Sequence, residues 1–246
     1  MTDAVSLHVQ GPVLTAQLRR PARGNALDDA LVDGLMAALA AAAMPDIRLL
    51  VLQGEGRNFC TGFDLAGLET QSDGDLLRRF VRIELLLQAI HHAPVPCLAL
   101  AQGRVFGAGA DIFAACRWRV ATPSTSFAFP GARFGLVLGT RRLAMVAGAQ
   151  AALDLTQLGR TLDAPAALRC GLATDMVEEA AFAATVAAYA AELAATPRET
   201  VSALRDAALP DHRAQDLAAL VHSAAAPGLG ARIAAYAAQR AKAKPS

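Results

Sequence analysis

Apolar residues alternate with polar ones along residues 5–9 and 13–18, on either side of a break at Gly11-Pro12. Alternation with a period of two around a turn predicts a hairpin of two strands. From residue 27 onward the apolar positions recur at helical spacing until a proline ends the pattern, which predicts a first helix. We expect the side chain of Asn25 to cap the start of this helix.

The middle of the chain alternates between short apolar runs and longer amphipathic stretches. Strands and helices in this rhythm are typical of an α/β architecture. The short runs predict strands at residues 49–52, 97–101, 118–121 and 126–129, and the longer stretches predict helices at residues 75–91 and 108–116.

From Arg141 onward the pattern is almost wholly helical, apart from one strand at residues 173–177. We therefore expect an α/β core over residues 1–195 and a helical C-terminal region over residues 196–246. The C-terminal region carries more apolar surface than isolated helices can hide, which predicts that it takes part in self-association.

The composition narrows the class of protein. Of the 246 residues, 54% are hydrophobic and 18% are charged, which excludes a mainly disordered chain. The formal net charge is +1 and there is no basic run, so we expect no nucleic-acid partner. The only lysines are Lys242 and Lys244. An anionic ligand bound by the body of the protein must therefore be held by arginines or backbone amides.

The four cysteines, at positions 60, 97, 116 and 170, are widely spaced and form no CxxC pair. We interpret them as free thiols in a reducing compartment and expect no metal site. The first residues lack the basic and apolar segments of a signal peptide. No apolar stretch approaches the roughly 20 residues that a membrane span needs. We therefore expect a cytoplasmic protein without a membrane partner.

Two glycine-containing segments, residues 59–65 and 103–111, each follow a predicted strand, and the second also opens a helix. A helix that begins in small residues presents free backbone N–H groups, which favour negative charge. If the two segments lie together, one amide from each can hold a single oxygen, as in an oxyanion hole. The alternative is that the glycines only allow tight packing. Ile112 stands where a dinucleotide-binding motif has its third glycine.

In their order and separation, these segments resemble the crotonase superfamily, also called the enoyl-CoA hydratase/isomerase family. Arg20-Pro21 followed by Asn25-Ala26-Leu27 is similar to the family's entry into its first helix. Residues 158–177 are similar to its turn, helix end and strand, and the resemblance covers residues 5–245. It implies a spiral of repeated ββα units with a C-terminal helical region that builds homotrimers or dimers of trimers.

The resemblance also implies the chemistry of the site. The ligand is an acyl-CoA thioester, with coenzyme A as part of the substrate and no separate cofactor. Matching the motifs places the two amides that hold the thioester oxygen on Phe63 and Ala108. Asp111 occupies the position of the first catalytic glutamate, and Gly131 occupies that of the second.

The same matching implies a set of residues around the substrate. Arg23 is the phosphate candidate, because Ala66 stands where the family often has a lysine. Tyr236 matches an aromatic residue near the adenine bound to a neighbouring subunit, although its spacing fits plain helix packing equally well. The substrate-binding set is Arg23, Cys60, Gly62, Asp64, Leu65, Gly107, Gly131 and Tyr236.

Gly131 separates the candidate functions. Addition of water normally uses two carboxylates, so we expect hydration to be slow or absent with Asp111 alone. The leading hypothesis is an enzyme of the enoyl-CoA hydratase/isomerase type that forms an enolate; isomerase, hydrolase and decarboxylase activities stay open. The alternative is an acyl-CoA-binding protein with little or no hydratase activity. A purely structural trimer leaves residues 59–65 unexplained.

Overall fold

The computed structural model describes residues 4–242, with side chains through Gln239. Its main sheet has six strands in the order β1-β2-β3-β4-β6-β9. The first pair is antiparallel and the other pairs are parallel. The strands are β1 (Val5–Gln10), β2 (Val13–Leu18), β3 (Leu49–Gly54), β4 (Cys97–Ala101), β6 (Trp118–Ala121) and β9 (Asp175–Met176).

A second sheet has three strands in the order β5-β7-β8. They are β5 (Arg104–Phe106), β7 (Ser126–Ala128) and β8 (Leu162–Asp163), with β5 parallel to β7 and β7 antiparallel to β8. Strand β4 of the main sheet is followed closely along the chain by β5 of the small sheet, and β6 is followed by β7. This alternation matches the spiral of ββα units that the resemblance implies.

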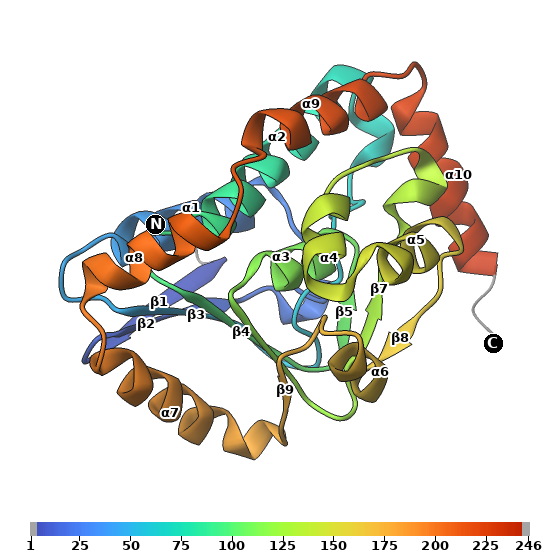
Figure 1. Cartoon of the computed structure of the whole chain (residues 1–246). Helices are drawn as coiled ribbons and strands as arrows, with labels where there is room; N and C mark the ends of the chain where they lie inside the picture. Colours follow the sequence, from blue (N-terminus) through green and yellow to red (C-terminus); the bar gives the residue numbers. More distant parts are fainter. Residues whose placement is uncertain (1–3, 243–246) are drawn as a thin grey trace.

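The helices cover both faces of the main sheet and extend over the C-terminal region (Figure 1). Short 3-10 turns lie at η1 (Pro21–Arg23), η2 (Leu68–Thr70), η3 (Pro130–Phe134) and η4 (Glu179–Ala181). The α-helices are α1 (Asp29–Ala42), α2 (Asp73–His91), α3 (Ala108–Ala115), α4 (Thr140–Ala147), α5 (Ala149–Gln157), α6 (Ala164–Arg169), α7 (Phe182–Ala194), α8 (Arg198–Ala208), α9 (Arg213–Ala224) and α10 (Leu229–Lys242).

The sheet divides the apolar interior into two parts. One face packs against α1, α2 and α3, and all five residues of β4 are buried. The other face is covered by α7, where Tyr189 lies 4.7 Å from Trp118 between ring centroids. A strand covered on both faces is a continuous apolar run, which is why the sequence pattern of β4 does not alternate.

Two sequence expectations need correction. Asp28, not Asn25, caps α1, because its carboxylate accepts a hydrogen bond from Leu31 N–H at 2.8 Å. Asn25 is buried in a left-handed conformation, and its amide joins the backbones of Arg20, Glu55 and Asn58 instead. The chain beyond residue 141 also contains β8, a two-residue strand that its helical pattern hides.

The C-terminal helices pack back on the core of their own chain. Helix α9 lies along α2, and α10 contacts η3 and α2 (Figure 1). Within residues 4–242 no single helix has the length and hydropathy of a membrane span; α9 and residues 229–239 meet that criterion only as a pair bent by 80°. The division at residue 195 stays a prediction, and residues 1–3 and 243–246 lie outside the described range.

Candidate active site

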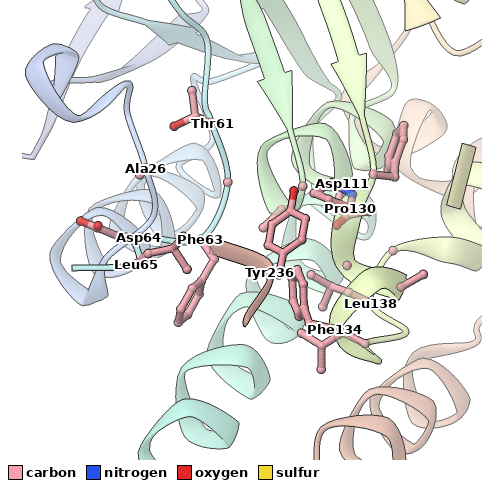
Figure 2. A pocket seen from close by; sticks show the side chains of 18 of the residues that line it. Ala26, Thr61, Phe63, Asp64, Leu65, Asp111, Pro130, Phe134, Leu138 and Tyr236 are labelled. Carbon is pink, nitrogen blue, oxygen red and sulfur yellow. The ribbon is translucent and has the colours of Figure 1, made fainter. Parts of the chain in front are cut away.

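A cavity of about 700 Å³ opens between the loop before α1, the segment after β3, the start of α3 and the turn η3. Figure 2 shows Phe63, Asp64 and Leu65 on one side of it and Asp111, Pro130, Phe134 and Leu138 on the other. The cavity therefore joins the two glycine-containing segments that the sequence singles out.

The segment 60–64 is held between two neighbours that fix the direction of one amide. On one side Leu27 N–H donates to Gly62 O at 2.7 Å, and on the other Phe106 N–H donates to Cys60 O at 3.0 Å. No cis peptide occurs in residues 4–242. In a trans peptide the N–H points opposite to the C=O. The Phe63 N–H therefore points away from Leu27, toward the start of α3.

The Ala108 amide is the first N–H of α3. Gly107 O accepts the helical hydrogen bond from Asp111 N–H at 3.0 Å, so the Ala108 N–H in the same peptide points back out of the helix. A Cβ placed on Gly62 would lie 3.4 Å from Ala108 N. Among residues 4–242 neither the Phe63 nor the Ala108 amide donates to another protein group. These two free donors are adjacent at the cavity wall.

Glycine at two positions allows this close approach. Gly62 adopts φ +97°, and a Cβ there would lie 2.7 Å from Phe106 O. A Cβ on Gly109 would lie 2.3 Å from Cys60 O. Contacts below 3.0 Å with backbone cannot be relieved by rotating a side chain, so α3 can approach the segment 60–64 only with glycine at both positions.

The Asp111 side chain lies one turn into α3 and reaches the same cavity, although only 7% of the residue is exposed. Burial raises the pKa of Asp111 to about 7; the positive charge of Arg142 opposes this rise and the negative charge of Glu84 adds to it. Gly139 makes room for the carboxyl, since a Cβ there would lie 2.1 Å from Asp111 Oδ1. A carboxyl with this pKa can both accept and donate a proton near neutral pH.

Gly131 also lines the cavity, in the turn η3. Among the described residues that line the cavity, Asp64 and Asp111 are the only ones with a carboxylate. Asp64 serves as an anchor for two loops. Burial acts to raise its pKa, but hydrogen bonds from Ala66 N–H, Arg20 and Arg23 lower it. Asp111 is therefore the carboxyl with a pKa suited to proton transfer.

The structure brings ten of the eleven predicted site residues to this cavity. Cys60 is the exception: its side chain is fully buried behind the wall, so it is a packing residue rather than a contact for the substrate. Arg23 is half exposed and forms an ion pair with Asp64 at 3.2 Å. Tyr236 lines the cavity of its own chain and packs against Phe134, with 5.2 Å between ring centroids; its expected place near the adenine bound to a neighbouring subunit stays a prediction.

Sequence reasoning missed the polar support behind Asp111. Arg142 is buried and forms ion pairs with Glu84 of α2 and with Asp216 of α9. Arg141 pairs with Asp216 at 2.7 Å. Because the partners are 58 and 74 residues away from Arg142, no local motif could reveal this network. It joins three helices beside the carboxyl. Within residues 4–242, no three His, Cys, Asp or Glu side chains gather as a metal site requires.

The chain resembles known proteins over most of its length. The sequence model of the family described as enoyl-CoA hydratase/isomerase matches residues 8–225. The "Probable enoyl-CoA hydratase echA6" of Mycobacterium bovis is 34% identical over 184 residues, which cover 72% of this chain and 74% of that protein. A "Probable enoyl-CoA hydratase" of Rhodobacter capsulatus is 35% identical over 195 residues, which cover 77% of this chain and 75% of that protein.

The solved structures agree with this assignment. The crystal structure of a Bordetella parapertussis protein described as an enoyl-CoA hydratase/isomerase superposes with a TM-score of 0.93 at 44% identity, covering 98% of this chain and 99% of that one. An enoyl-CoA hydratase from Bacillus halodurans, 22% identical, shares the fold with a TM-score of 0.84 and covers 95% of this chain and 100% of that one. On its sequence and its fold, this chain belongs to the enoyl-CoA hydratase/isomerase, or crotonase, family.

Proposed function

We propose that the protein is an acyl-CoA thioester enzyme that forms an enolate, with the Phe63 and Ala108 amides on the thioester oxygen and Asp111 as the acid and base. The observation that carries this proposal is the meeting of two free N–H groups and one carboxyl of pKa about 7 in a single cavity. Donors that are fixed before the reaction stabilise the charge that develops on the oxygen more than they stabilise the neutral thioester.

A single carboxyl of this kind suits a proton shift. The Asp111 carboxylate takes a proton from the carbon next to the thioester, and the electrons of that C–H bond form the enolate. The same proton then returns from Asp111 to the γ-carbon, the double bond moves into conjugation, and the carbonyl re-forms. No group is consumed, so one residue completes the cycle. We therefore favour double-bond isomerisation over addition of water.

Gly131 supports the same preference. Hydration needs one group to activate water and another to protonate the α-carbon, and each such group contributes about 10²–10⁴-fold. With glycine at this position, we expect crotonyl-CoA hydration to be slow or absent. The second candidate is an acyl-CoA-binding protein with little or no activity, which the absence of a side chain at Gly131 favours.

We propose that coenzyme A binds along one part of the cavity wall. Residues 21–24, Ala26 and Arg104 line the cavity, so guanidinium and backbone groups are available for its phosphates. We also propose that the protein assembles as a homotrimer or a dimer of trimers. Leu204 of α8 is 60% exposed and Met145 of α4 is 40% exposed, which fits burial of these side chains in an assembly.

The proposal is tested with a panel of saturated, 2-enoyl and 3-enoyl CoA thioesters, with binding and turnover measured separately. Conversion of a 3-enoyl-CoA to its 2-enoyl isomer, with little hydration of crotonyl-CoA, is the expected result. Efficient hydration of crotonyl-CoA would refute the role assigned to Gly131. Tight binding of several thioesters without turnover of any would favour the binding protein.

A further inference from the structure

The Phe63 amide belongs to a short segment outside the regular strands, so other contacts must keep it in place. The segment pairs with its neighbours only through two isolated bridges, from Phe63 to Leu27 and from Cys60 to Val105. The Phe63 ring points toward helix α2 (Figure 2), where it stacks on Phe80 with 4.4 Å between ring centroids. Helix α2 therefore adds a third support to the hydrogen bonds from Leu27 and Phe106 that hold this segment.

Arg79 of α2 makes several contacts with this segment. Its guanidinium carbon lies 4.0 Å from the centre of the Phe63 ring. Its Nη2 donates to Asp64 O at 3.0 Å and to Leu27 O at 3.5 Å, and its Nη1 donates to Gln71 Oε1 at 2.8 Å. Arg79 is only 9% exposed and is absent from the cavity lining.

We propose that Arg79 is a positioning residue for the Phe63 amide, and this inference rests on the proposed function of that amide. Its guanidinium contacts the ring of Phe63, the carbonyl of the next residue and the carbonyl of the residue that pairs with Phe63. Because it joins both sides of the bridge, it restrains the peptide plane that directs the N–H into the cavity. Arg79 does not touch the substrate and acts through Phe63.

The planar fork of arginine is required for this arrangement. A guanidinium can donate from two nitrogens in one plane while its face lies against an aromatic ring. Lysine keeps the charge but has a single ammonium that cannot meet Gln71, Leu27, Asp64 and the ring together. We therefore expect Arg79→Lys to leave the amide less well aligned, and Arg79→Met to release it further.

The effect should appear in chemistry rather than in binding. A displacement of about 1 Å at a reacting centre can cost about 10²-fold in rate. The contacts proposed for coenzyme A, in the loop before α1 and at Arg104, do not include Arg79. The affinity of the protein for the thioester should therefore change little. We expect the rate of α-proton exchange in bound butyryl-CoA to fall by about 10²-fold in Arg79→Met at saturating ligand, with Arg79→Lys between this variant and the wild type.

A direct test reads the carbonyl itself. Butyryl-CoA labelled with ¹³C at the thioester carbon is bound to the full-length protein, and isotope-edited infrared spectra give its carbonyl frequency. Two amide donors lower this frequency relative to water. Arg79→Met and Arg79→Lys are compared with Arg78→Met, a matched control because Arg78 is exposed and its partner is Asp29 on α1. We expect the Arg79 variants to lose part of the lowering and the control to keep it.

Each outcome decides the inference. A carbonyl frequency and exchange rate equal to wild type in both Arg79 variants, with only a lower melting temperature, would show a structural role and overturn it. If Arg79→Met fails to fold, Arg79→Lys gives the same decision. A normal wild-type binding affinity with no lowering of the carbonyl frequency would refute the amide site itself, and with it the proposed function, whatever the variants show.

Discussion

Replacing Asp111 by asparagine should make the protein more stable at alkaline pH, in addition to inactivating it. Asparagine has the shape of a protonated aspartic acid but cannot ionise. In the folded chain burial raises the pKa of Asp111 from 3.8 to about 7, so its ionised form is strongly disfavoured there. The variant removes that penalty without removing volume from the site.

The sign and size follow from linkage. Because the folded state keeps a proton that the unfolded chain has already lost, the stability that Asp111 contributes is present below pH 4. It is lost as the pH rises through 7. A pKa of about 7 against 3.8 corresponds to a penalty of about 4 kcal/mol at pH 8. We therefore expect Asp111→Asn to raise the free energy of unfolding by up to about 4 kcal/mol at pH 8, and by less at pH 5.

The assay is urea unfolding of both proteins at pH 5 and pH 8, at one protein concentration because assembly also affects stability. His91 titrates in the opposite sense. Burial, with help from His92 and Arg142, lowers its pKa to about 4, so the stability it contributes is lost as the pH falls below 6.5. That change is common to both proteins and cancels in their difference. Asp46→Asn, at an exposed carboxyl, is the control. A difference between Asp111→Asn and wild type that does not grow with pH would refute the reasoning.

Three further expectations can be checked with ordinary assays. Gly109→Ala should lower both the melting temperature and the turnover rate, because its Cβ would lie 2.3 Å from Cys60 O. Gly131→Ala is the comparison: the atom nearest to its Cβ would be 3.7 Å away, so the melting temperature should change little. Gly131→Glu should raise crotonyl-CoA hydration by 10-fold or more by supplying a second carboxyl, of the kind that contributes about 10²–10⁴-fold elsewhere, and an unchanged rate would contradict this account of Gly131. Sedimentation at micromolar concentration should show a trimer or hexamer, and a monomer would exclude the proposed assembly.

Long elements could be predicted from the sequence because their apolar patterns are local. The strand at residues 97–101 coincides with β4, and the helix expected at residues 75–91 differs from α2 only in its first turn. Strands β5 and β8 have three and two residues, too few for a periodic pattern. Their pairing with β7 depends on contacts formed only in the folded chain.

The candidate site also has a part that the sequence could predict and a part that it could not. The glycine-containing segments and Asp111 were predicted through their resemblance to a known family, which places residues but not their surroundings. The pKa of Asp111 depends on burial and on charges from α2 and α4, and the contacts of Arg79 join residues up to 52 positions apart. The sequence alone also does not show that α10 folds back on its own chain and brings Tyr236 to this cavity.

The central claim is that two amides and Asp111 form an enolate from a bound thioester. The most direct measurement is exchange of the α-protons of butyryl-CoA with D₂O, followed by NMR, in the wild type and in Asp111→Asn, with affinity for butyryl-CoA measured in parallel. The account predicts exchange by the wild type and none above background in the variant, at similar affinity. Undiminished exchange in Asp111→Asn, or no exchange by a wild type that binds butyryl-CoA, would contradict it.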